Sequence, residues 1–312
     1  MVDSKLSTYV EQLSNSLKGV GTDEDSLIKV TIQHPLETRL KLKAQYKMSY
    51  GRDLIEDLKS DLSGDFLDLM LALYSDIYEY DAEECHKAIK GFGTNEDTLI
   101  EIIGTRPGWM LKKIKEEYKK KYKTDLENDV KSDTSGNFRK LLTSLLQCTR
   151  SLNKNPNIEK CKQIAEELYN AGEKRLGTDE QIFNKYFGNC SGAELMYIAR
   201  EYHKLNGNSL LKAIESEFSG NISKLIKTVF YANISPSEYF ATRIRDAVKG
   251  LGTKEKILNR VIVTRNEIDM KLIIKYYKML YSEDMVEDIK SDTSGDYRKL
   301  LLGIATVNNL SQ

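Results

Sequence analysis

The sequence has few prolines, few cysteines, few histidines and no net charge. Only 4 prolines interrupt its 312 residues, which leaves room for many unbroken helices. Its 47 basic residues balance 47 acidic ones, so net charge predicts no polyanion partner, and nucleic-acid binding is not expected. No run of about eighteen apolar residues occurs, so no membrane-spanning helix is expected. These shortages favour a soluble, helix-rich protein.

The 4 cysteines and 3 histidines do not suggest a redox or metal site of their own. The cysteines lack the CxxC spacing, and the N-terminus shows no secretory signal, so we expect reduced, structural thiols in a cytoplasmic protein. The histidines are far apart in the sequence, so nothing local supports a histidine site. We also find no nucleophile elbow, P-loop or HExxH motif. The sequence therefore does not predict an enzyme.

Two short phrases recur four times along the chain. The first is KGVGT from Lys18, KGFGT from Lys90, KRLGT from Lys174 and KGLGT from Lys249. The second is an acid followed two residues later by Ser-Gly, at Asp61, Asp133, Glu217 and Asp292. In every copy the acid follows the glycine of the Gly-Thr pair by 40 residues. Four equal spacings indicate one folded unit used four times.

Within each copy the apolar residues recur at helical spacing, and no alternating run suggests a strand. We therefore predict an all-α fold of four repeats, each with about five helices. The predicted boundaries are 1–75 for the first repeat, 76–150 for the second, 159–234 for the third and 235–312 for the fourth. The segment at 151–158 is rich in Asn, Ser and Pro and is typical of a linker. It predicts that the array divides there into two pairs.

The loop phrase has a purely structural interpretation as a helix–turn–helix corner. Gly19 would be the left-handed residue that ends a helix, and Thr22 would cap the next one in a capping box with Asp25. Thr94 and Thr178 repeat this pattern, whereas copy four has a lysine in place of the acid. This interpretation does not require the second glycine. It also leaves the constant distance to the later acid unexplained, unless that acid is itself a helix cap.

A calcium site would link the two phrases. Calcium takes about six to eight oxygen ligands and accepts backbone carbonyls readily. A loop with two glycines can turn successive carbonyls inward without side-chain clashes. Three carbonyls and one bidentate carboxylate would give about five ligands and leave room for an outside oxygen. Such a site should bind calcium weakly alone and more tightly when an anion completes it.

The repeated K-G-x-G-T followed by D/E-x-S-G resembles the annexin family, over almost the whole chain from Lys5 to Val307. The resemblance implies a slightly curved disc of four five-helix repeats. It implies calcium as the cofactor, held by inter-helix loops, and an anionic phospholipid surface as the partner that completes the coordination.

By position, the resemblance implies four calcium sites. Their residues are Leu17, Gly19, Gly21 and Asp61; Ile89, Gly91, Gly93 and Asp133; Gly172, Arg175, Gly177 and Glu217; and Val248, Gly250, Gly252 and Asp292. A minor site is implied at Thr22 and Glu24. Copy three departs from the family pattern, because Phe218 stands where a small polar residue is usual.

Apolar residues stand between or beside the loop glycines, at Val20, Phe92, Leu176 and Leu251. They could pack on neighbouring loops, or they could enter the headgroup zone of a membrane. A further position, thirteen residues after the motif glycine, usually carries arginine in annexins. Arg106 and Arg265 keep it, whereas His34 and Cys190 replace it, which leaves the packing between repeats open.

The function predicted from these features is calcium-dependent, reversible binding to anionic phospholipid membranes. The protein would be cytoplasmic and would associate peripherally with membranes when calcium is high. Cytoskeletal proteins and self-association on membranes are further partners that the resemblance leaves open. The alternative is a helical scaffold that binds protein or cytoskeletal partners independently of calcium.

Overall fold

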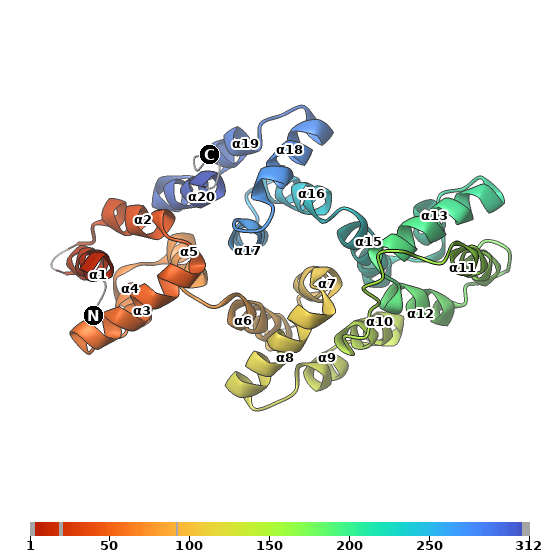
Figure 1. The fold of residues 1–312 in the computed structure, drawn as a ribbon, viewed down its shortest axis with the longest axis horizontal. Coiled ribbons are helices and arrows are strands. Elements are labelled where there is room, and N and C mark those ends of the chain that lie inside the picture. Colours follow the sequence, from red (N-terminus) through yellow and green to blue (C-terminus); the bar gives the residue numbers. More distant parts are fainter. Residues whose placement is uncertain (1–3, 19–20, 92, 308–312) are drawn as a thin grey trace. The chain divides into compact units, whose positions relative to one another are not determined.

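The computed structural model describes residues 4–18, 21–91 and 93–307, and these form 20 α-helices and no strand (Figure 1). Copy one contains α1 (Ser4–Ser16), α2 (Glu24–Gln33), α3 (Leu36–Tyr50), α4 (Leu54–Asp61) and α5 (Gly64–Leu73). Copy two contains α6 (Ile77–Ile89), α7 (Glu96–Thr105), α8 (Gly108–Tyr122), α9 (Leu126–Asp133) and α10 (Gly136–Leu146). Copy three contains α11 (Ile158–Ala171), α12 (Glu180–Asn189), α13 (Gly192–Asn206), α14 (Leu210–Glu217) and α15 (Gly220–Ile234). Copy four contains α16 (Pro236–Val248), α17 (Glu255–Arg265), α18 (Met270–Tyr281), α19 (Met285–Asp292) and α20 (Gly295–Val307). The predicted all-α fold of five helices per copy is confirmed.

The third helix of every copy ends in the same way. Its C-cap residue is in the left-handed region, and the backbone N–H of that residue donates to the carbonyl four residues earlier. These residues are Gly51, Lys123, Gly207 and Ser282, with φ of 67°, 59°, 77° and 56°. Two of the four are not glycine, so this stop rests on the backbone hydrogen bond rather than on glycine alone.

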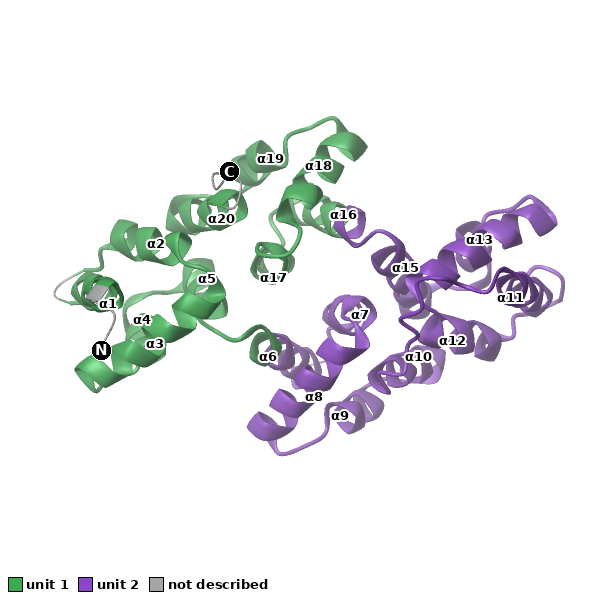
Figure 2. Ribbon diagram, in the orientation of Figure 1, with its two compact units in different colours: residues 1–80, 240–312 green, residues 81–239 purple. Residues whose placement is uncertain are grey.

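The chain forms two compact units, and they group the copies differently from the prediction (Figure 2). One unit contains residues 1–80 and 240–312, which are copies one and four except that it includes the start of α6 and lacks the start of α16. The other contains residues 81–239, which are copies two and three without the start of α6 and with the start of α16. The prediction that the linker separates two pairs is therefore wrong.

Helices of copies two and three pack on each other, α7 on α15 and α10 on α12, and hydrogen bonds fix the linker between them to copy three. The amide of Ser151 donates to the carbonyl of Asn189 at 2.8 Å. The hydroxyl of Ser191 donates to the carbonyl of Asn153 at 2.7 Å. A polar composition typical of a connector here belongs to a segment fixed inside one unit.

Each unit packs its helices by the same scheme. In the first unit α2 lies against α20, and α5 lies against both α17 and α20. In the second unit α7 lies against α15, and α10 lies against both α12 and α15. The same pairs of helices thus hold copies one and four together as hold copies two and three.

A glycine allows close contact between α7 and α15 and between α2 and α20. In the first pair the glycine is on α7, and in the second pair it is on α20. A Cβ at Gly104 of α7 would lie 2.9 Å from Cγ2 of Thr228 on α15. A Cβ at Gly303 of α20 would lie 2.8 Å from Cγ2 of Ile32 on α2. Gly104 and Ile32 occupy the same position in their copies, and so do Thr228 and Gly303. One side of each contact is small, so the helices can approach closely.

The position that usually carries arginine pairs with a residue of the first helix in three copies. In copy two Arg106 donates from Nε to Asp81 at 2.7 Å, and both side chains are buried. In copy four the guanidinium of Arg265 lies 4.6 Å from the ring centroid of Phe240. In copy one the ring of His34 meets Tyr9 edge-on, with centroids 4.3 Å apart. The partner on the first helix therefore differs between the copies even where the arginine is kept: it is Asp81 in copy two and Phe240 in copy four.

Cys190 occupies this position in copy three and is buried. Burial raises the pKa of its thiol to about 12, so the thiol is neutral and acts as a small core residue. Within the described ranges, no helix combines the length and the apolar composition that crossing a bilayer requires.

Candidate metal sites at the helix corners

Each copy has a corner loop between its first and second helices, at residues 17–22, 89–94, 172–178 and 248–253. One backbone hydrogen bond closes each loop, because the N-cap amide of the second helix donates back to the end of the first helix. These bonds are Asp23 to Ser16 at 3.0 Å, Asn95 to Ala88 at 2.8 Å, Asp179 to Ala171 at 2.7 Å and Lys254 to Ala247 at 2.9 Å. The four corners are therefore closed by the same hydrogen bond, with one additional residue in copy three.

The second glycine of each loop is the one in the left-handed region. Gly21, Gly93, Gly177 and Gly252 have φ of 93°, 85°, 81° and 79°. A Cβ at these glycines would meet nothing within 4 Å, so the backbone conformation and not packing explains glycine here. The first glycines of copies two and four, Gly91 and Gly250, do not have positive φ. Gly19, for which we predicted that conformation, lies outside the described residues.

The predicted caps are displaced by one residue. The N-cap of the second helix is Asp23, Asn95 or Asp179, and its side chain accepts a backbone N–H in the first turn. The threonines predicted as caps, Thr22, Thr94 and Thr178, come just before these residues. The prediction was wrong because two residues that both favour the N-cap stand side by side, and Asp and Asn are preferred over Thr.

The threonine hydroxyls instead connect the two recurring phrases. Thr94 donates to Oδ2 of Asp133 at 2.7 Å and lies 3.0 Å from its carbonyl oxygen. Thr178 donates to Oε2 of Glu217. Thr253 donates to the carbonyl of Asp292 at 2.6 Å. In three copies the structure therefore places the acid directly beside the glycine loop.

The four acids, which we call the corner acids, differ in exposure. Asp61 is exposed and accepts a hydrogen bond from Ser60 at 2.8 Å, whereas Asp133, Glu217 and Asp292 are half-buried. Oδ2 of Asp292 is buried and has no hydrogen-bond partner in the described part of the chain. A buried carboxylate oxygen without a donor suits a cation ligand.

The side chains and the backbone of the loops face different surroundings. Leu17, Ile89 and Val248 stand where the first helix ends, and their side chains are buried. The glycines that follow, including Gly91, Gly93, Gly177, Gly250 and Gly252, are exposed. Carbonyls at a helix end have no partner within the helix. Buried apolar side chains thus anchor the helix ends, and these five glycines are exposed, whereas Gly172 of copy three is buried.

Copy three brings its predicted residues together in spite of the longer loop. A Cβ at Gly172 would lie 3.4 Å from Cγ of Glu217, so the loop and the acid are in contact. The amide of Arg175 donates to the carbonyl of Gly172 at 2.9 Å, which leaves that oxygen one lone pair. The side chain of Arg175 is exposed and lies 3.9 Å from Asp179. Phe218 is buried and packs against Phe183, so it points into the core.

Leu176 and Leu251 are fully exposed at the tips of their loops, with relative exposures of 103% and 108%. Val20 and Phe92, which we predicted for the same role, lie outside the described residues. Thr22 and Glu24 of the predicted minor site stand at the start of α2, and both are half-buried.

A polar hollow of about 440 Å³ adjoins the corner of copy two. Its wall includes Gly91, Gly93, Thr94, Lys87 and Lys224. Lys224 comes from copy three and bonds Asp97 at 2.9 Å. The hollow gives an outside ligand room beside the loop backbone and places two cations near it.

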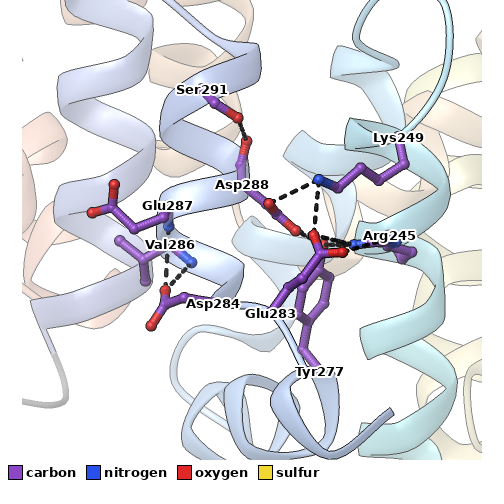
Figure 3. A network of polar contacts seen from close by, with 9 residues as sticks. All are labelled: Arg245, Lys249, Tyr277, Glu283, Asp284, Val286, Glu287, Asp288 and Ser291. Atoms are coloured by element: carbon purple, nitrogen blue, oxygen red, sulfur yellow. Dashed lines mark hydrogen bonds and ion pairs between the residues drawn. The ribbon is translucent and has the colours of Figure 1, made fainter. Parts of the chain in front are cut away.

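Copy four surrounds its loop lysine with acids (Figure 3). Lys249 lies 2.9 Å from both Asp288 and Glu283, and Arg245 lies 2.7 Å from Glu283. Hydrogen bonds from Arg245 and then Lys249 lower the pKa of Glu283 to about 2. The same acids raise the pKa of Lys249. The positive charge of this loop is therefore largely balanced before any ion approaches.

Among the described residues, no group of three His, Cys, Asp or Glu side chains could hold a metal. A site at these corners would therefore use backbone oxygens with one carboxylate, which is a donor set that suits calcium. From the sequence we predicted Thr22 for a minor site but missed the hydrogen bonds from the loop threonines to the corner acids. One feature of the sequence could have revealed this second role of the threonines. Copy four keeps Thr253 although Lys256 stands where a capping box needs an acid.

Comparison with known proteins gives one consistent family. The family model described as Annexin matches residues 9–73, 80–145, 163–229 and 239–304. The chain is 41% identical over 294 residues to annexin A7 of Homo sapiens, covering 94% of this chain and 60% of that protein. It is 42% identical over 294 residues to annexin A13 of Mus musculus, covering 94% and 93%. This chain therefore spans less than two thirds of the human relative.

Solved structures agree. The structure of annexin III matches with a TM-score of 0.94 and 37% identity, over 98% of this chain and 95% of that one. The structure of calcium-bound annexin (Sm)1 matches with a TM-score of 0.84 and 32% identity, over 96% and 90%.

Proposed function

The chain belongs to the annexin family, whose members generally bind phospholipid in a calcium-dependent way, and on this premise we propose that it binds anionic membranes reversibly as calcium rises. The observation that supports the proposal best is the hydrogen bond between the loop threonine and the corner acid in copies two and three. It holds the only carboxylate of each proposed site against the exposed glycine backbone.

The proposed ligands in each copy are the loop carbonyls and the corner acid named above. When bound, calcium supplies the positive charge that joins protein oxygens to a lipid phosphate. The chain's own residues shape the site: buried Leu17, Ile89 and Val248 fix the helix ends, and the left-handed glycines allow the tight turn of the backbone. Thr22 and Glu24 would form a minor site in the same way.

We propose that the exposed leucines of copies three and four enter the headgroup region once the loops touch a membrane. The apolar side chains of Leu176 and Leu251 are fully exposed at the loop tips. Full burial of a leucine side chain contributes about 1.5–3 kcal/mol. Val20 and Phe92 would act in the same way in copies one and two.

Annexins are generally binding proteins and not enzymes, and we propose no catalytic role. We propose that the protein is cytoplasmic and reaches membranes only through calcium. Cytoskeletal partners and self-association on membranes stay predictions. A calcium-independent scaffold is the alternative, and the experiment below separates it from membrane binding.

The test is sedimentation with vesicles that contain phosphatidylserine. We expect the protein to pellet with vesicles in calcium and to return to the supernatant when a chelator is added. The variant with Asp61→Asn, Asp133→Asn, Glu217→Gln and Asp292→Asn should lose calcium-dependent pelleting while its helical circular dichroism is unchanged.

The control removes the same four negative charges elsewhere. Glu37, Glu56, Glu159 and Glu287 are exposed and lie outside the corners, and their change to Gln should leave pelleting intact. Equal pelleting of the parent protein with and without calcium would contradict the proposal and favour the scaffold.

A further inference from the structure

The corner loop of copy three contains a carboxylate that is held from outside the loop. Oε2 of Glu173 accepts from the hydroxyl of Tyr202 at 2.6 Å and from Nδ2 of Asn206 at 2.7 Å. Its Oε1 accepts from Nδ2 of Asn208 at 2.8 Å. Tyr202 is fully buried in α13, and the two asparagines stand at the end of that helix and just after it. The loop is thus fixed to a rigid part of copy three.

The other copies use the equivalent tyrosine differently. There the tyrosine of the third helix donates to an acid that precedes the corner acid by one helical turn. These pairs are Tyr46 with Asp57 at 2.6 Å, Tyr118 with Asp129 at 2.7 Å and Tyr277 with Asp288 at 2.5 Å. Copy three has Ala213 at this helix position. In copy three the acid that accepts from the tyrosine is therefore in the loop and not in the fourth helix.

The charges that anchor the loop can be compared between copies three and four, because both loops are fully described. In copy four the loop contributes a cation, Lys249, which lies 2.9 Å from Asp288 and Glu283 of the body (Figure 3). In copy three the loop contributes the anion, and the body contributes neutral donors. The two loops are therefore anchored with opposite polarity.

We propose that Glu173 is the positioning residue of the copy-three corner and holds the loop in its calcium-receptive shape before calcium arrives. This inference rests on the proposed function, in which the loop carbonyls of Gly172, Arg175 and Gly177 and the carboxylate of Glu217 hold the ion. Ordering a flexible loop during binding costs conformational entropy, so a loop that is already fixed binds at lower cost.

The backbone of the same loop supports this role. The amide of Lys174 donates to the carbonyl of Tyr169 at 3.1 Å, and that of Arg175 donates to Gly172 at 2.9 Å. Both amides lie directly after Glu173, so its anchor limits the motion that would break them. The corner of copy three should therefore need less rearrangement than its longer sequence suggests.

The test uses a tryptophan reporter on the loop tip. The native tryptophan is removed by Trp109→Phe, and Leu176→Trp then reports calcium binding at copy three by fluorescence. In this background Glu173→Ala should raise the calcium concentration at half-change about tenfold, because hydrogen bonds to a charged group are lost. Glu173→Gln should raise it about threefold or less, since the amide oxygen still accepts from Tyr202. Tyr202→Phe should fall between the two.

A matched reporter and a calcium-free measurement complete the design. With Leu251→Trp in place of Leu176→Trp, Glu173→Ala should leave the midpoint of copy four unchanged. Without calcium, Glu173→Ala should speed hydrogen exchange at the amides of Lys174 and Arg175 about tenfold or more, and Glu173→Gln should speed it less.

The outcomes separate the two proposals. If Glu173→Gln weakens calcium binding as much as Glu173→Ala and exchange is unchanged, charge and not position is responsible, and the inference is overturned. A calcium response with equal midpoints in all variants overturns the inference alone. A parent reporter that does not respond to calcium overturns the copy-three site itself, and the inference with it.

Discussion

The threonine of the corner loop has a different role from the one that its residue type suggests. From the sequence Thr94 is a good helix cap, but Asn95 caps the helix and Thr94 bonds the corner acid. The local preference ranks Asn above Thr as a cap, but only the distant acid shows what the threonine hydroxyl bonds instead. The glycine pair was predictable because turns demand it, but which glycine has positive φ depends on the whole loop.

At the residue scale we predict that the Thr94 hydroxyl aids calcium binding by holding Asp133 in place. Thr94→Val should weaken calcium binding at copy two about threefold to tenfold, which corresponds to one hydrogen bond. Thr94→Ser keeps the donor and should bind like the parent. Calorimetry in a background of Asp61→Asn, Glu217→Gln and Asp292→Asn measures copy two alone. Equal affinity of the valine and serine variants would show that the hydroxyl has no part in binding.

At the scale of elements, helix number and type followed from the sequence because each stripe of apolar residues must be covered. Which helices cover each other did not follow. The contact of α20 with α2 depends on Gly303 facing Ile32, and in α7 and α15 the small residue is on the other helix. Such complementarity joins residues far apart in the chain, and no local pattern shows it. The predicted repeat boundaries stay a prediction.

The close contact between α20 and α2 predicts that an alanine in place of its glycine lowers the free energy of unfolding. Gly303→Ala should destabilise the protein by about 1–3 kcal/mol because its Cβ would meet the stiff, β-branched Ile32, although alanine favours helices. Gly250→Ala is the control, since its Cβ would meet nothing within 4 Å and its φ is not positive. Urea unfolding measures both free energies. In an Ile32→Ala background the cost of Gly303→Ala should shrink, and an unchanged cost would rule out the contact as its cause.

At the scale of the whole molecule, four copies were visible in the sequence but their grouping was not. The linker has the composition of a connector, yet hydrogen bonds to Asn189 and Ser191 fix it within one unit. The corner sites do not depend on this grouping, because each is built within its own copy. Membrane binding is therefore expected to sum four similar contacts, and loss of one corner should weaken it without abolishing it.

The central claim is that backbone oxygens and one distant acid hold calcium at each corner and leave a position for a lipid phosphate. The most direct test is a crystal structure with abundant calcium and a soluble glycerophospholipid headgroup. We expect an ion at the corners, about 2.3–2.6 Å from the loop carbonyls and the corner acid, with a phosphate oxygen completing the shell. Empty corners, or calcium held only by other surface carboxylates, would contradict it.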